Sequence, residues 1–339
     1  MEADNNPVSP MKKVFLTGAD GLLGSNLCHE LTARGYHVVA FIEKGKNPLT
    51  IKHLSNLTIK EGDILDSENL TRQMNGCNYV IHAAANTTVN PARSPIIVKV
   101  NVEGTKNVLS IAEKIQPEKI VVVGSANSFS PGSKENPGRE GTPYTCHIYN
   151  CDYMDSKYQA YLEAMDAFEN RGMPILSVHP TFMLGPFDSK PSSGALIMAV
   201  YKRKTLAATK GGKNYVHVKD VANAIVNALE IGRAGENYIL GNENLTYREM
   251  FDLVSRVVNV PKPKFVLPKS LTLAYGLANN FIQRSTKKPV AVNYTMCRIS
   301  CDDHYYTAQK AVNEIGLQQT PIDKAIQESF KWMKNYFQI

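Results

Sequence analysis

The sequence predicts an α/β protein with a doubly wound parallel sheet and a smaller, mostly helical C-terminal domain. Three observations support this prediction. Short apolar runs alternate with helical patterns through the first half of the chain, a glycine-rich turn joins the first run to the first helix, and helical patterns dominate from Leu245 onward. Strands that alternate with helices form parallel βαβ units, and helices then cover both faces of the sheet.

The first half of the chain supplies the elements of the main sheet in order. Strands are predicted at 12–18, 36–42, 57–64, 78–85 and 119–125. Helical patterns lie between them, from 22 to 34, near 67–75 and, as one long helix, near 96–115. The run "VVVGS" at the end of the fifth strand is apolar on both faces, which is typical of a central parallel strand.

The second half divides the chain into two predicted domains. The strand 174–180 continues the alternation, and 181–212 is rich in loop residues; a short strand entering a helix and a last strand, 237–240, follow. We therefore expect a disordered lead at 1–10 and a main-sheet domain formed by 11–180 plus 213–240. The smaller domain would consist of 181–212 plus 241–339.

The composition argues against several classes of protein. Of 339 residues, 43% are hydrophobic and 20% charged, as in an ordinary globular protein. The net charge of +7 comes from scattered basic residues, without the dense tract that nucleic acid or an anionic membrane would suggest. The chain shows no signal-peptide pattern, no membrane-spanning run and no metal-ligand spacing among its six cysteines. We expect a cytoplasmic protein without a metal, a nucleic-acid partner or a membrane span.

A glycine-rich turn follows the first strand and opens the first helix. It has the spacing Thr17-Gly18-x-x-Gly21-x-x-Gly24. Small residues let the backbone approach a pyrophosphate, whose negative charge is favoured at a helix N-terminus. A strand, this turn and a helix in succession predict a dinucleotide-binding site.

The end of the second strand bears on the choice between NAD and NADP. An acidic residue there binds the ribose 2′-hydroxyl of NAD and repels a 2′-phosphate. Glu43 occupies this place, but Lys44 and Lys46 follow it and could hold the phosphate of NADP. The predicted cofactor is therefore NAD or NADP, with Glu43 favouring NAD. After the third strand, Asp63 could contact the adenine amine or cap the following helix.

Tyr153 and Lys157 lie four residues apart in a helical pattern, which places them on one face. The same spacing recurs at Tyr215–Lys219 and Tyr306–Lys310, so the spacing alone is weak evidence. Among the three, Tyr153 alone directly follows the half of the chain that begins with the glycine turn and ends with a serine at the end of a strand, Ser125. Positive charge beside a phenol lowers its pKa toward the operating pH, where the phenol can exchange a proton with a substrate.

Taken in order, these features resemble the extended short-chain dehydrogenase/reductases of the NAD-dependent epimerase/dehydratase family. The resemblance includes "HAAA" at 82–85 and "NVEGTKNVL" at 101–109, and it covers about 12–260 well. Within the family, the stretch beginning "HPTFMLGPFDSKPSSG" is similar to dihydroflavonol-reductase-like proteins. The stretch from Asn214 to Val254 is also similar to hopanoid-associated sugar epimerases. The resemblance implies a Rossmann domain that binds NAD(P) and a C-terminal domain that binds substrate.

The resemblance also implies roles for individual residues. Ser125, Tyr153 and Lys157 would be catalytic, with Asn101 supporting the lysine through water. Asn127, Ser128 and Phe182 would contact substrate, although Asn127 and Ser128 could equally cap a turn. The cofactor would contact a larger set: Thr17, Gly18, Asp20, Gly21, Leu22, Leu23, Gly24, Glu43, Lys44, Asp63, Ile64, Ala83, Ala84, Ala85, Lys157, Pro180 and Thr181.

Two departures from the family pattern bear on the reaction. His179 and Phe182 stand where nucleotide-sugar members have arginine and asparagine, and "SAN" stands where dehydratases have an acidic pair. We therefore expect a reductase of ketones or aldehydes, with a sugar epimerase as the alternative and a non-catalytic cofactor-binding protein as a third. The resemblance further implies a homodimer formed by the helices near 96–115 and 150–170. It does not identify the small-molecule substrate.

Overall fold

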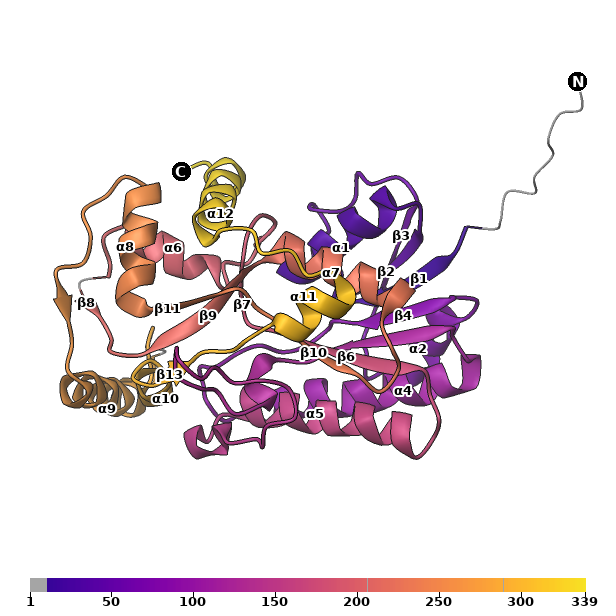
Figure 1. The fold of residues 1–339 in the computed structure, drawn as a ribbon, viewed down its shortest axis with the longest axis horizontal. Helices are drawn as coiled ribbons and strands as arrows, with labels where there is room; N and C mark the ends of the chain where they lie inside the picture. Colours follow the sequence, from indigo (N-terminus) through magenta and orange to yellow (C-terminus); the bar gives the residue numbers. More distant parts are fainter. Residues whose placement is uncertain (1–10, 206, 289) are drawn as a thin grey trace, which may run out of the picture.

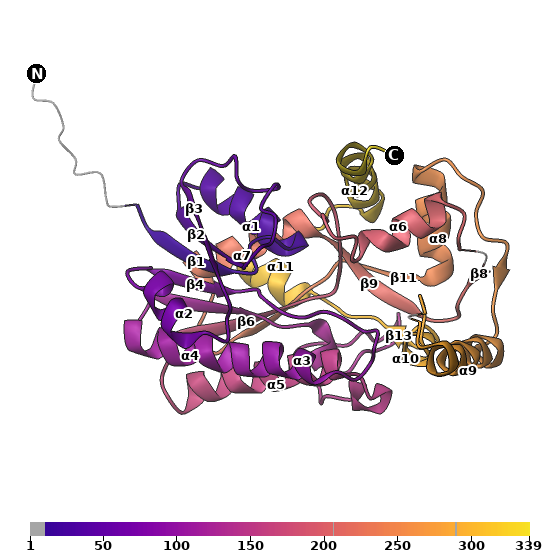
Figure 2. The same cartoon turned by 180° about the vertical axis from the view of Figure 1, so that it is seen from behind.

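The computed structural model describes residues 11–205, 207–288 and 290–339, so the predicted lead at 1–10 lies outside the described residues. Its centre is a seven-stranded parallel sheet with the order β10-β6-β5-β4-β1-β2-β3 (Figures 1 and 2). This sheet confirms the predicted Rossmann-type fold. Its strands are β1 (Lys13–Thr17), β2 (His37–Glu43), β3 (Leu57–Gly62), β4 (Tyr79–His82), β5 (Lys119–Val123), β6 (Ile175–Pro180) and β10 (Asn237–Leu240).

Helices cover both faces of the sheet because successive strand residues point to opposite sides. In β1, Val14 and Leu16 join one core, whereas Phe15 joins the other. The first core lies under α1 (Leu22–Ala33), α7 (Val218–Ile231) and α11 (Gln309–Ile315). The second lies under α2 (Ser67–Met74), α4 (Gly104–Ile115) and α5 (Asp152–Glu169), on the opposite side of the sheet in Figure 1.

The predicted long helix near 96–115 is interrupted. It consists of α3 (Pro95–Val98), a π-helical turn at Lys99–Glu103 and α4. A π-turn inserts one extra residue into a helix and often marks a functional site. Asn101 is the middle residue of this turn, so its side chain is directed by a local irregularity that the apolar pattern did not reveal.

A second, smaller sheet lies beyond the carboxyl ends of the main strands. Its order is β11-β9-β13, and β7 also pairs with β9. The strands are β7 (Phe182–Leu184), β9 (Gly212–His217), β11 (Glu243–Thr246) and β13 (Asp303–His304), while β8 (Ala207–Ala208) pairs separately with β12 (Phe265–Val266). The surrounding helices are α6 (Gly194–Tyr201), α8 (Tyr247–Val257), α9 (Lys269–Thr286), α10 (Tyr294–Ile299) and α12 (Ile322–Phe337).

Two elements pack across the predicted domain division, one strand and one helix. β9 pairs only within the smaller sheet, although the sequence analysis grouped its residues with the main sheet. In the other direction, α11 packs against the core of the main sheet, although it falls within 241–339. The division of the chain into an NAD(P)-binding and a substrate-binding domain remains a proposal, with β9 and α11 as the elements that cross it.

Candidate active site

A cavity of about 1320 Å³ lies at the carboxyl ends of β1, β4, β5 and β6 and extends to residues of the smaller sheet. Crevices at this edge of an open α/β sheet are its usual binding sites. Four predicted residues do not line the cavity: Thr17, Lys44, Asn101 and Ser128. The others do: Gly18, Asp20, Gly21, Leu22, Leu23, Gly24, Glu43, Asp63, Ile64, Ala83, Ala84, Ala85, Ser125, Asn127, Tyr153, Lys157, Pro180, Thr181 and Phe182.

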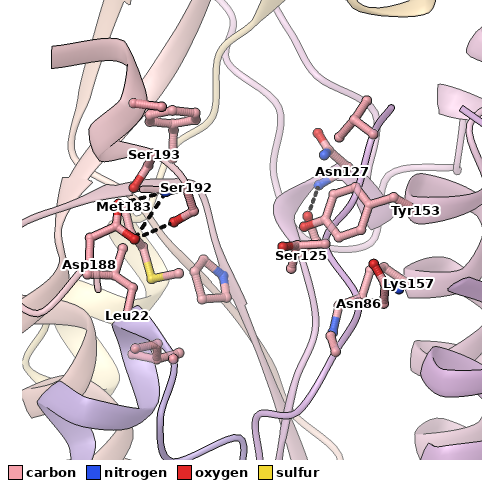
Figure 3. A pocket seen from close by; sticks show the side chains of 18 of the residues that line it. Leu22, Asn86, Ser125, Asn127, Tyr153, Lys157, Met183, Asp188, Ser192 and Ser193 are labelled. Carbon is pink, nitrogen blue, oxygen red and sulfur yellow. Dashed lines mark hydrogen bonds between the residues drawn. The ribbon is translucent and has the colours of Figure 1, made fainter. Parts of the chain in front are cut away.

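Two walls of this cavity face each other in Figure 3. One wall comes from the ends of main-sheet strands and from α5, and the other comes mainly from the loop before α6. The first presents Asn86, Ser125, Asn127, Tyr153 and Lys157, and the second presents Leu22, Met183, Asp188, Ser192 and Ser193. The sequence analysis predicted most of the first wall and little of the second.

The glycine turn has the shape that a dinucleotide requires. Gly18 has a φ of +71°, and a Cβ there would lie 2.8 Å from the Ala84 backbone. A Cβ on Gly24 would lie 2.0 Å from the Gly18 carbonyl oxygen, whereas one on Gly21 would come no nearer to protein than 3.4 Å. Helix α1 has no side-chain cap, so its first N–H groups are available to an anion. Gly18 and Gly24 therefore pack the turn, and Gly21 leaves room above it.

Thr17 lies beneath the glycine turn rather than in the cavity. Its Oγ1 accepts hydrogen bonds from the N–H groups of 83–84, both at 3.1 Å, and donates to His82 Nδ1 at 2.8 Å. His82 Nε2 donates to Thr105 Oγ1 at 3.0 Å, and that hydroxyl donates to the Asn101 carbonyl at 2.7 Å. Burial lowers the pKa of His82 to about 3, so its ring is neutral and serves as one donor and one acceptor. This chain of bonds fixes β4 between β1 and α4.

Tyr153 and Lys157 share a face of α5 beside Ser125, which follows β5 (Figure 3). Lys157 is buried and donates a hydrogen bond to the Val123 carbonyl, and burial lowers the pKa of its ammonium to about 8. Burial raises the pKa of Tyr153 above its ordinary value, and a hydrogen bond with Ser125 opposes part of that rise. The sequence analysis expected positive charge beside the phenol to lower this pKa, and burial acts in the opposite direction.

Asn101 connects the cavity wall to α5, the helix of Tyr153 and Lys157. Its Nδ2 donates to the Asn86 carbonyl at 3.0 Å and to Ser156 Oγ at 2.9 Å, and its Oδ1 accepts the Asn86 N–H at 2.7 Å. Ser156 in turn donates to the Tyr153 carbonyl at 3.1 Å. Asn101 is thus placed to position α5 and the loop at Asn86, a cavity residue that the sequence analysis missed.

Acidic residues at the predicted adenosine end have separate local partners. Asp63 Oδ1 accepts the Leu65 N–H at 2.9 Å, whereas the cap of α2 is Asp66. Capping the helix, the alternative role considered for Asp63, therefore falls to another residue. Glu43 lines the cavity and forms an ion pair with Lys46 at 3.1 Å.

The loop before α6 contributes polar groups that the sequence analysis did not assign. Asp188 is buried, and its carboxylate accepts hydrogen bonds from the N–H groups of Ser192 and Gly194 at the start of α6. An acidic residue and serines ahead of an apolar run form a capping pattern that could have revealed it. Lys190 from this loop pairs with Asp20 at 3.0 Å, which ties the second wall to the glycine turn.

Lys213 is a second residue that the sequence analysis missed. It lines the cavity from β9, in register with His304 of β13, and its ammonium lies 5.0 Å from the centre of the Phe182 ring. Among the described residues, no carboxylate pairs with Lys213. Burial lowers the pKa of Lys213 to about 8 and that of His304 to about 4, so Lys213 supplies the positive charge here at neutral pH. Two strands far apart in the chain form this site, so no local sequence pattern predicts it.

The two other Tyr-x-x-x-Lys matches do not form comparable pairs. Tyr215 is fully buried in β9, and Tyr306 precedes α11 rather than lying in a helix. Lys219 and Lys310 are each held by a glutamate at 2.6 Å. Across the described ranges, no helix has the length and apolar character to cross a bilayer, and no cluster of His, Cys, Asp or Glu side chains could hold a metal ion.

Known proteins share both the sequence pattern and the fold. The model of the NAD dependent epimerase/dehydratase family matches residues 14–241. A Synechocystis protein named "Putative dihydroflavonol 4-reductase" is 31% identical over 331 residues, 95% of this chain and 94% of that protein. The 2-alkyl-3-oxoalkanoate reductase of Shewanella oneidensis is 27% identical over 89% of this chain and 81% of that protein. The crystal structure of gox2253 matches with a TM-score of 0.84 and 28% identity, over 96% of this chain and 98% of that chain.

Proposed function

Because the chain belongs to the NAD-dependent epimerase/dehydratase family, we propose that it transfers a hydride between a nicotinamide cofactor and a carbonyl/alcohol pair of its substrate. The family and its reductase relatives make it an NAD(P)-dependent enzyme of the extended short-chain dehydrogenase/reductase type. The observation that supports hydride transfer best is the convergence of the glycine turn, Ser125, Tyr153 and Lys157 on one cavity. Oxidation of NADH or NADPH in the presence of a panel of ketones and aldehydes tests it.

The residues present fit a dinucleotide along the cavity. The open space above Gly21 and the uncapped start of α1 would receive the pyrophosphate. Glu43 and Asp63 would face the adenosine, and Pro180–Thr181 would face the nicotinamide. Bound there, the cofactor supplies or accepts a hydride. Glu43 lines the cavity and its ion pair engages Lys46, which supports NAD over NADP as the cofactor.

The chain's own residues would handle the proton. Tyr153 Oη would give a proton to the substrate oxygen in reduction and take it back in oxidation. Ser125 Oγ would donate a hydrogen bond to the same oxygen and hold the carbonyl in place. Lys157 would hold the nicotinamide ribose, and Asn101 would keep α5 in position. Burial raises the pKa of Tyr153, so positive charge brought close to the phenol would be needed to lower it.

The position of Lys213 in the cavity indicates which carbonyl compounds the protein would accept. This lysine adds one cation to a cavity whose neighbouring walls include Phe182, Met183 and Leu196, all apolar. An apolar substrate with one anionic group would complement this combination. The name of the Shewanella relative denotes such a compound, a 3-oxo acid with a 2-alkyl chain. We therefore propose 3-oxo acids and the corresponding 3-hydroxy acids as substrates.

The substitution Lys213→Met is predicted to weaken the binding of acid substrates and to spare that of their esters. A charge-assisted hydrogen bond is worth about 1.5–3 kcal/mol, so we expect KM for a 3-hydroxy acid to rise about tenfold or more. The methyl ester of the same acid should be little affected. Since the pKa of Lys213 is about 8, KM for the acid should rise above that pH in the natural protein and lose this dependence in the variant. Steady-state kinetics of acid and ester provide the test.

Lys210→Met is the matched control for that prediction. Lys210 is exposed and does not line the cavity, so its replacement should leave both KM values unchanged. Equal losses for acid and ester in Lys213→Met would show that the lysine does not recognise the carboxylate.

A homodimer is proposed for the face formed by α3, α4 and α5. Ile96 and Val98 of α3 and Leu162 of α5 leave apolar surface exposed, at 52%, 40% and 40%. Covering them would remove that surface from water. Sedimentation velocity should show a dimer at micromolar concentration, and Leu162→Glu should shift it to a monomer. A natural protein that sediments as a monomer would refute this interface.

A further inference from the structure

The helix α9 exposes an apolar face that nothing in the described chain covers. Its inner side contacts α10, where a Cβ on Gly276 would lie 2.9 Å from the Tyr294 Cα. Five large apolar side chains lie on its outer side, over an arc of the helix directed away from Gly276 and the buried Thr272. They are Leu271, Tyr275, Leu277, Phe281 and Ile282, exposed by 57%, 55%, 56%, 72% and 49%.

The short strand β12 extends this apolar surface. Its residues Phe265 and Val266 are exposed by 66% and 42%, and it precedes α9 by a short connection. In both whole-molecule views α9 lies at the end of the molecule away from β3 (Figures 1 and 2). Monomeric proteins rarely leave large apolar residues grouped in this way unless the group binds a partner.

The part of the chain that contains β12 and α9 is also strongly basic. From 253 to 301 the sequence contains eight basic residues and no aspartate or glutamate, whereas the whole chain has a net charge of +7. Two of the eight, Lys262 and Lys269, pair with aspartates outside the segment. Five others are exposed without a carboxylate partner among the described residues: Arg256, Lys264, Arg284, Lys287 and Lys288. These charges are spread along the chain, so the search for a dense basic tract overlooked them.

Charge distinguishes among the partners that could cover this surface. A second copy would place two strongly positive segments against each other, which Coulomb repulsion opposes. An anionic bilayer satisfies both features, because apolar side chains enter the interface while lysine and arginine attract the phospholipid headgroups.

The surface also borders the substrate cavity. Ala207 of β8, which pairs with β12, lines the cavity, as do Ala291 and Val292 after α9 and Met296 of α10. An apolar substrate leaving a membrane would therefore meet the substrate end of the cavity beside the docking surface.

We propose that α9 and β12 dock this protein on the surface of an anionic phospholipid membrane. The helix lies along the interface without crossing it, with the outer side of α9 in the headgroup region and Lys287 and Lys288 against anionic lipid. This docking goes beyond the proposed reaction and does not depend on it.

Vesicle co-sedimentation of the full chain tests the proposal. The protein is expected to bind vesicles of phosphatidylcholine mixed with phosphatidylglycerol and to be released by about 0.5 M salt. The double variant Lys287→Gln/Lys288→Gln should bind roughly 25-fold more weakly, at about fivefold for each lysine lost. Phe281→Ser should weaken binding by about tenfold. Each variant is exposed at the changed positions and should keep the melting temperature of the natural protein.

Matched variants elsewhere on the surface complete the test. Lys52→Gln/Lys331→Gln removes the same charge, and Ile231→Ser changes an apolar residue that is 61% exposed on α7. Both should bind vesicles as the natural protein does. No binding of the natural protein to these vesicles, or equal losses in the control variants, would overturn the proposal. So would a natural dimer that Phe281→Ser dissociates, which would assign the surface to a second copy.

Discussion

Tyr153→Phe is expected to lower turnover by about 10²–10⁴-fold, the usual contribution of a general acid or base. Phenylalanine keeps the ring of Tyr153 in its place on α5 and removes only the hydroxyl that would exchange the proton. The glycine turn and Lys157 are untouched, so the affinity for NAD should remain about the same. Steady-state turnover and cofactor titration by fluorescence measure the two effects separately.

Tyr158→Phe provides a control from the same helix. Tyr158 stacks on Tyr144 with ring centres 4.2 Å apart and does not line the cavity. Its loss of a hydroxyl should leave turnover unchanged. If Tyr153→Phe retained natural turnover, the proposed proton transfer would be wrong, and the candidate site would need another acid.

Gly24→Ala and Gly21→Ala are both expected to weaken NAD binding, but only Gly24→Ala should also destabilise the fold. The new Cβ at Gly24 would lie 2.0 Å from the Gly18 carbonyl oxygen and 2.7 Å from the Ala19 Cα, both backbone atoms. Relieving this overlap should lower the free energy of unfolding by at least about 2 kcal/mol and displace the turn. At Gly21 the nearest protein atom is 3.4 Å away, so the fold should be preserved. The added methyl group would instead occupy space proposed for the pyrophosphate.

Thermal unfolding and NAD titration together separate these outcomes. Gly24→Ala should lose both stability and affinity, whereas Gly21→Ala should keep its melting temperature and bind NAD at least about tenfold more weakly. Undiminished NAD binding by Gly21→Ala would place the pyrophosphate elsewhere.

Local sequence determined the features that the sequence analysis predicted correctly. The apolar run of β1, the glycine turn and the start of α1 adjoin one another in the chain, so their residues alone specify the turn. Likewise Tyr153 and Lys157 belong to one helix, whose period fixes their relative placement. These elements form the wall of the cavity that the main sheet supplies.

Features that depend on distant residues escaped prediction. The site of Lys213 arises where β9 pairs with β13, and the assignment of β9 to the smaller sheet follows from that pairing. Asn101, in the π-turn, forms hydrogen bonds with Asn86 and Ser156, partners that its own segment does not indicate. The pattern of α9 resembles that of a buried amphipathic helix, because periodicity shows that a helix has an apolar face but not what covers that face.

Isotope transfer tests the proposed reaction most directly. The substrate would be a 3-hydroxy acid carrying deuterium on its alcohol carbon, incubated with NAD⁺, and mass spectrometry would locate the label. The proposed hydride transfer predicts that NADH accumulates in step with the oxo acid and that each NADH carries the deuterium. If label instead remains in a product inverted at that carbon and no NADH accumulates, the protein is an epimerase and the reductase assignment is wrong.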